Sequence, residues 1–134
     1  MTTDDASGLD LDLAVASLRA DAADVKSLLK MLVDDLGAGL GARLHVQRTG
    51  GVFRKGGDVR SVRIEVGDEE FEAVVEGEAL RCGIGHASGG IRIRTEKTDM
   101  DGWLARLLGA LRAEAARSQN VREALENLLV RGQP

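Results

Sequence analysis

The feature that most constrains this chain is the alternation of apolar and charged residues between Arg60 and Arg94. Alternation with a period of two is the pattern of β-strands that bury one face and expose the other. The residues expected on the buried face are Val62, Ile64, Val66, Phe71, Ala73, Val75, Leu80, Cys82, Ile84, Ile91 and Ile93. The stretch therefore predicts an antiparallel β-meander.

Two pairs that begin with glycine, Gly67-Asp68 and Gly77-Glu78, interrupt the alternation where hairpin turns are needed. A two-residue type II′ turn requires a positive φ at its first residue, and glycine adopts that conformation without a steric penalty. Every apolar residue stays on one face when the chain folds about these turns. The expected cross-strand pairs are Ile64–Phe71, Arg63–Glu72, Val75–Leu80, Ala73–Cys82 and, across a loop at residues 86–89, Ile84–Ile91.

Helical periodicity precedes the meander. Apolar residues recur at alternating spacings of four and three over residues 9–36, which predicts one long amphipathic helix with an unbroken heptad seam. Gly37 follows the last residue of that seam and is a suitable helix stop. Residues 43–48 alternate again and add a first strand, so the meander spans residues 43–95 and has about five strands.

A second helical pattern follows the meander over residues 99–130. Asn120 with Glu123 three residues later resembles the start of a capping box, so a break near Ser118–Asn120 into two helices is the alternative. Seven-residue intervals between apolar positions persist across this point. We therefore expect one long helix, bent near Ser118.

The order helix, meander, helix in 134 residues predicts a single α+β domain of two layers, with both helices on the apolar face of the sheet. Residues 1–8 are polar and acidic, and we expect them to form a disordered tail.

Composition excludes several classes of protein. A chain that is 43% hydrophobic and 30% charged is typical of a globular domain. The net charge of −4 argues against nucleic acid as the main partner. A single cysteine excludes an internal disulfide, and no apolar run approaches the ~20 residues of a membrane span. We expect a cytoplasmic protein without a membrane anchor, and the bias toward Arg and Ala is typical of GC-rich bacteria.

Residues with catalytic or metal-binding potential are few. Cys82 lies on the buried side of its strand, and a zinc site would need more ligands than Cys82, His45 and His86. The glycine-rich segment 83–90 lacks the lysine and Ser/Thr of a phosphate-binding loop. The sequence therefore predicts no catalytic residue, cofactor or metal.

The apolar surface of the helices is wider than a two-stranded seam. Packing on the sheet is one explanation, and packing against a second copy of the chain is the other. The leading hypothesis is a non-enzymatic protein-interaction or homodimerisation module, with a second copy or another protein as its partner. Its expected interface residues are Val15, Leu18, Ala22, Val25, Leu29, Val121, Leu125 and Leu128.

The segment from Arg48 to Arg60 supports an alternative hypothesis. It combines cations, paired glycines and one stackable Phe53, which are features of sites for anionic ligands or nucleic acid. A plain surface loop explains the same residues. If the segment binds a ligand, we expect the contacts to come from Arg48, Arg54, Lys55 and Arg60.

Overall fold

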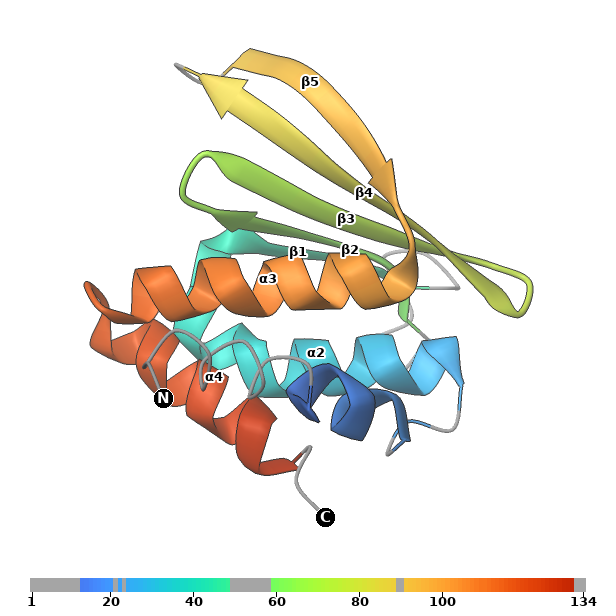
Figure 1. The fold of residues 1–134 in the computed structure, drawn as a ribbon, viewed down its shortest axis with the longest axis horizontal. Coiled ribbons are helices and arrows are strands. Elements are labelled where there is room, and N and C mark those ends of the chain that lie inside the picture. The colour runs from blue at the N-terminus through green and yellow to red at the C-terminus, as the bar shows by residue number, and fades with distance from the viewer. Residues whose placement is uncertain (1–12, 21, 23, 49–58, 89–90, 132–134) are drawn as a thin grey trace, which may run out of the picture.

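The computed structural model describes residues 13–20, 22, 24–48, 59–88 and 91–131, which form an α+β fold (Figure 1). A five-stranded antiparallel sheet is packed on one face by helices, and residues 13–20 are helical. The predicted tail at residues 1–8 lies outside the described residues. The remaining elements are α2 (Val25–Leu40), the short 3₁₀ helix η1 (Gly41–Arg43), β1 (Leu44–Arg48), β2 (Val59–Val66), β3 (Glu69–Glu76), β4 (Ala79–Ser88), β5 (Ile91–Thr98), α3 (Met100–Ala115) and α4 (Gln119–Arg131).

The strands pair in chain order, β1-β2-β3-β4-β5, which confirms the predicted α+β class and meander. Four predicted cross-strand pairs are observed: Ile64–Phe71, Arg63–Glu72, Ala73–Cys82 and Val75–Leu80. Gly67 has a φ of 60° and Gly77 a φ of 63°, while no described residue other than glycine has a positive φ. A positive φ confined to the first turn residue is the type II′ pattern, as predicted.

The core lies between the sheet and the two helices that contact it, α2 and α3. Phe71 from β3 and Trp103 from α3 are both fully buried, and their rings meet edge to face with centroids 6.4 Å apart. The Trp103 Nε1–H donates a hydrogen bond of 3.2 Å to the carbonyl of Gly83 in β4. The indole therefore fixes α3 against the centre of the sheet without leaving a polar atom unpaired.

The single N-terminal helix predicted over residues 9–36 is wrong. Residues 13–20 form one helical segment, and α2 begins separately at Val25. Asp24 is the N-cap of α2, and its side chain accepts a hydrogen bond of 2.8 Å from the Ser27 amide. This cap satisfies one of the backbone N–H groups left without an intrahelical partner at the break. Heptad spacing did not reveal the break because Leu18 and Val25 are buried in either arrangement.

The predicted stop at Gly37 is also wrong, because α2 continues through Gly37 and Gly39 to Leu40 and ends at Gly41, where φ is 57°. Gly39 has a packing role instead. A Cβ at this position would lie 2.4 Å from the backbone oxygen of Asn120 and 2.5 Å from the Cβ of Ala124, both in α4. Glycine thus lets α4 approach α2 closely.

The expectation of one long C-terminal helix is corrected to the alternative of two helices. α3 ends at Ala115 and α4 begins at Gln119. The Ser118 hydroxyl accepts a hydrogen bond of 3.3 Å from the Val121 amide, so Ser118 rather than Asn120 caps the second helix. α4 packs against α2 and α3, on the side of those helices away from the sheet (Figure 1).

The predicted pairing of Ile84 with Ile91 is wrong, because Ile84 lies opposite Glu96. β4 extends to Ser88, and its register with β5 shifts between His86 and Ala87. The observed pairing is longer than the predicted one and satisfies more backbone groups. It also sets a polar residue, Glu96, on the face of the sheet that carries Ile84.

Candidate interaction surface

The β4–β5 hairpin forms one edge of the sheet and rises away from the helices (Figure 1). The strongest helix–sheet contacts are made to β1, β2 and β4 rather than to β5. Ile91, at the start of β5, is 71% exposed. Among the described residues of the sheet, Ile91 is the one large apolar side chain that is exposed, and it lies on the edge strand that the helices contact least.

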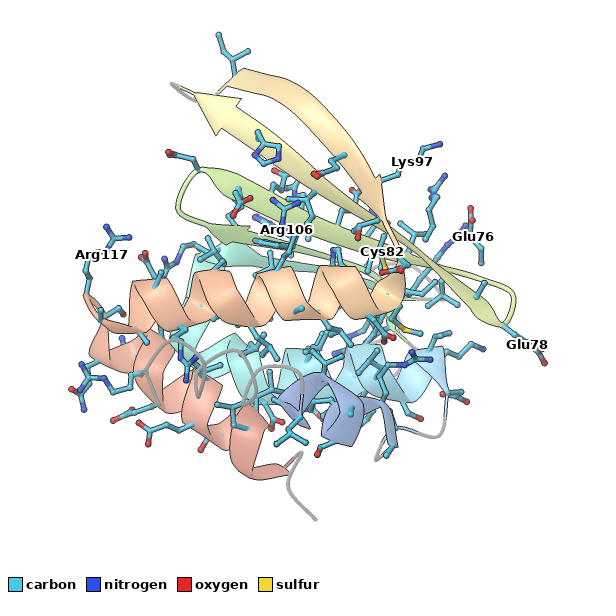
Figure 2. The ribbon with its side chains drawn as sticks, viewed as in Figure 1. Glu76, Glu78, Cys82, Lys97, Arg106 and Arg117 are labelled. Carbon is cyan, nitrogen blue, oxygen red and sulfur yellow. The ribbon has the colours of Figure 1, made fainter. Side chains whose placement is uncertain are left out.

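A group of charged residues ties this hairpin to α3. Arg106 of α3 donates to both oxygens of Glu96 in β5, at 2.9 and 2.8 Å, and to Glu69 in β3 at 3.0 Å. The hydrogen bond to Glu96 is the main cause that raises the pKa of Arg106. His86 lies beside this group, with its Nδ1 3.7 Å from Glu69. Figure 2 shows Arg106 reaching from α3 toward the sheet.

Among the residues that the structure describes, no strand pairs with the outer edge of β5. Glu76 and Ala79 flank a two-residue turn, so they form a hydrogen-bonded pair. Hydrogen-bonded and non-hydrogen-bonded pairs alternate along antiparallel strands, so every second residue of β4, including Ile84, directs its backbone groups toward β5. Ile84 lies opposite Glu96, and the N–H and C=O of Glu96 therefore point toward β4. The same alternation directs those of Thr95 and Lys97 away from β4, toward the edge. Both side chains are exposed, and Figure 2 shows Lys97 pointing outward from β5.

The opposite edge of the sheet is less open. β1 has five residues, and its register with β2 shifts between Gln47 and Arg48. A short edge strand is one of the ways in which proteins protect an edge from further pairing, whereas a register shift is present at both edges. β5 has eight residues, so it is the longer of the two free edges.

The eight residues predicted as a dimer interface lie within the fold of one chain. Leu18, Leu29, Val121 and Leu128 are fully buried, and Val15, Val25 and Leu125 are nearly so. Ala22 is half-buried against the same core. The described part of the helical seams therefore packs the helical segment 13–20, α2 and α4 together and leaves little of these eight side chains exposed. Their role as an interface stays a prediction.

Of the predicted anion-binding residues, the structure describes Arg48 and Arg60. Both are exposed, and they lie on neighbouring strands because Arg48 pairs with Val59. Arg54 and Lys55 lie outside the described residues. The structure thus places two of the four predicted cations on neighbouring strands.

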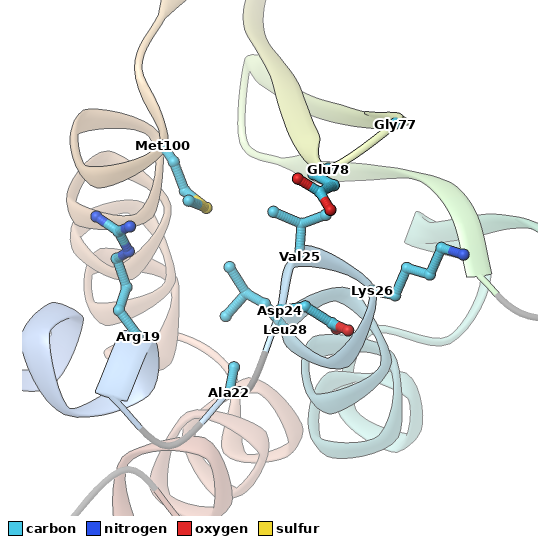
Figure 3. Close-up of a pocket in the computed structure, with 9 residues that line it drawn as sticks. All are labelled: Arg19, Ala22, Asp24, Val25, Lys26, Leu28, Gly77, Glu78 and Met100. Atoms are coloured by element: carbon cyan, nitrogen blue, oxygen red, sulfur yellow. The ribbon is translucent and has the colours of Figure 1, made fainter.

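A pocket of about 610 Å³ lies at the start of α2 and α3, beside the Gly77–Glu78 turn (Figure 3). Its charged groups come in opposite signs, and two of them have partners within the fold. Arg19 pairs with Asp101 at 2.6 Å, and Asp24 caps α2. The mixed charges around this pocket favour no single class of ligand.

The side chains with nucleophilic potential are constrained. Cys82 is buried in the core, and burial raises the pKa of its thiol to about 11, so the thiol stays protonated at neutral pH. Among the described residues, no group of three or more His, Cys, Asp or Glu side chains is arranged to hold a metal ion.

Comparisons with protein-family models, with curated proteins and with solved structures found no match. None of the helices in the described part of the chain is long and apolar enough to cross a membrane.

The β5 edge was not predicted from the sequence, because the loop between β4 and β5 was expected at residues 86–89. The adjacent pair Gly89-Gly90 was the available signal, since two consecutive glycines suit a two-residue hairpin turn. That turn alone would have set Ile84 opposite Thr95, and the register shift between His86 and Ala87 moves Glu96 into that position. Arg106, beside the apolar stripe of α3, was the signal for a polar partner on the sheet.

Proposed function

We propose that this chain is a non-enzymatic protein-interaction module whose docking surface is the β4–β5 hairpin and the free edge of β5. The observation that carries the proposal is an eight-residue edge strand with outward-directed backbone groups, next to the exposed Ile91. An extended segment of another polypeptide can add a strand to such an edge, with the backbone supplying affinity and neighbouring side chains supplying specificity.

The way the hairpin is held supports this proposal. Arg106 links Glu96 and Glu69 and so fixes β5 relative to α3 and β3. A partner strand then meets an edge that is already ordered, which lowers the conformational entropy lost on binding. Ion pairs of this kind add little to folding stability at an exposed site, so positioning is the better explanation of their geometry.

The proposal is tested by site-specific photocrosslinking in the native host. A benzophenone side chain is placed at Ile91 or Lys97, and at Arg117 as the control. The Arg117 side chain is 73% exposed and lies in the turn between α3 and α4. We expect discrete protein adducts from positions 91 and 97 and none from 117. Adducts of equal yield at all three positions, or no adduct at 91 and 97, would show that this edge is not a docking surface.

An anion-binding module is the second candidate, supported by Arg48 and Arg60 on neighbouring strands. Binding of this kind should weaken steeply as salt rises, because counterions are released. The double substitution Arg54→Ala/Lys55→Ala should abolish it while leaving the unfolding midpoint unchanged. Salt-independent binding to an oligonucleotide or polyphosphate, or unchanged binding by the double variant, rules this candidate out.

A further inference from the structure

We propose that the partner of the β5 edge is the β5 edge of a second copy of this chain, paired antiparallel about a two-fold axis at Thr95. The inference rests on the proposed function and names its partner. Such pairing would join two five-stranded sheets into one continuous ten-stranded sheet. It would also give the outward N–H and C=O of Thr95 and Lys97 hydrogen-bond partners.

Backbone geometry limits the registers that two β5 edges can adopt. In an antiparallel pair, residues directly opposite each other both direct their backbone groups toward the partner, or both direct them away. A two-fold axis must therefore pass through a residue of β5 and not between two residues. The part of β5 with a regular register to β4 is residues 94–98. An axis at Thr98 would leave almost no strand to pair on one side, because α3 begins at Met100, so the remaining axes are residues 94, 95, 96 and 97.

Charge selects one of these four registers. An axis at residue 94 sets Arg94 opposite Arg94 of the partner, and an axis at 96 or 97 sets Glu96 or Lys97 opposite itself. Like charges directly opposite each other destabilise a strand pair. The axis at Thr95 sets residue 94 opposite residue 96 of the partner, a basic position opposite an acidic one, and does so twice by symmetry.

The local structure accommodates this register. Glu96 accepts hydrogen bonds from Arg106, but a carboxylate has capacity for further donors. The threonines at the axis are small and β-branched, and opposed threonines are favourable on a sheet surface. The charges of β5 therefore destabilise the pairings with an axis at residue 94, 96 or 97 and favour the pairing with its axis at Thr95.

A proline substitution in β5 tests association through this edge and leaves the other surfaces of the molecule unchanged. Thr95→Pro removes the N–H that would bond across the two-fold axis, and it removes no bond to β4 because that N–H points outward. Thr95→Val retains the N–H and is the matched control. In multi-angle light scattering over a micromolar to millimolar series, we expect the unmodified chain and Thr95→Val to reach twice the 14.2 kDa of one chain. We expect Thr95→Pro to associate at least about tenfold more weakly.

Charge exchange provides a second test that does not alter the backbone. Arg94→Glu would set two acidic residues opposite each other and should weaken the dimer by about tenfold or more. The double variant Arg94→Glu/Glu96→Arg restores opposite charges in the Thr95 register alone and should recover at least part of the association. Circular dichroism and the unfolding midpoint of each variant establish that the fold is retained.

The outcomes distinguish this inference from the function on which it rests. A strictly monomeric chain at all concentrations, or equal association by Thr95→Pro and Thr95→Val, overturns self-pairing through this edge. If positions 91 and 97 nevertheless crosslink to a different protein, the interaction module stands and the second copy does not. If they crosslink to nothing, both proposals fail.

Discussion

Replacing Gly39 by alanine tests how α4 is held. This position decides whether the apolar residues of α4 are used inside one chain or are free to meet another. The added Cβ would lie 2.4 Å from the Asn120 backbone oxygen and 2.5 Å from the Ala124 Cβ. Both distances are about 1 Å or more inside ordinary van der Waals contact, and one of the atoms belongs to the backbone. α4 must therefore shift away from α2.

Two opposing effects set the size of the change. Overpacking of a well-packed contact costs up to about 3 kcal/mol, and this contact falls at the upper end because the backbone must move. Alanine in a helix interior is better than glycine by about 1 kcal/mol. We therefore expect Gly39→Ala to lower the free energy of unfolding by about 2 kcal/mol. For a chain of this length, that lowers Tm by roughly 6–8 °C.

Gly109→Ala is the matched control. Gly109 lies inside α3, and a Cβ there would have no neighbour within 4 Å. Only the helix-propensity effect remains, so we expect a stabilisation of up to about 1 kcal/mol. Urea unfolding followed by Trp103 fluorescence measures both variants against the unmodified chain.

The two variants should thus differ by about 3 kcal/mol and in opposite directions. If Gly39→Ala were instead stabilising to the same extent as Gly109→Ala, then α4 would not lie on α2 in solution. A partner could then contact Val121, Leu125 and Leu128. That result would support the helical interface predicted from the sequence.

Three further outcomes are expected. The Cys82 thiol should react with a disulfide reagent only as fast as the core opens, because burial raises its pKa to about 11; rapid reaction of the folded chain with the reagent in excess would contradict this. Trp103→Phe should destabilise by about 2 kcal/mol in urea unfolding, because it removes the bond to the Gly83 carbonyl and leaves space in the core; a neutral change would mean that the bond contributes nothing. The pKa of Glu114 is lowered chiefly by its hydrogen bond to Arg117, so the contribution of Glu114 to stability is present above the unfolded-state pKa and is lost as pH falls through the folded-state pKa. Glu114→Gln should therefore reduce the loss of stability on acidification. An identical acid transition in both proteins would contradict this.

The first four strands were predictable because local chemistry and burial agree there. Alternating apolar residues fix the face, and Gly67 and Gly77, each with a positive φ, fix the register of the two turns that join β2, β3 and β4. Shifting any of these strands by one residue would move its whole apolar set to the other face. That strong penalty is why Ile64–Phe71 and Ala73–Cys82 could be paired from the sequence.

The helix boundaries were harder to predict because the apolar spacing is compatible with continuous and broken helices. Asp24 and Ser118 are both good caps, but a capping residue within a strong apolar period is visible only once the neighbouring helices are placed. Gly39 was interpreted as a loosening of the connection after the helix. Its role depends on the approach of α4, which no local pattern contains.

The error in β5 has a different origin. Apolar residues at 91 and 93 were assigned to the buried face, yet Ile91 is exposed, and the position opposite Ile84 holds Glu96. Burial therefore does not determine the register of this strand; hydrogen bonding along β4 and the contacts of Arg106 do. Places where local sequence rules fail are more often functional than the rest of a fold. The strand that departs from the burial rule is also the strand with a free edge and one self-complementary register, and this coincidence makes β5 the part of the molecule to perturb first.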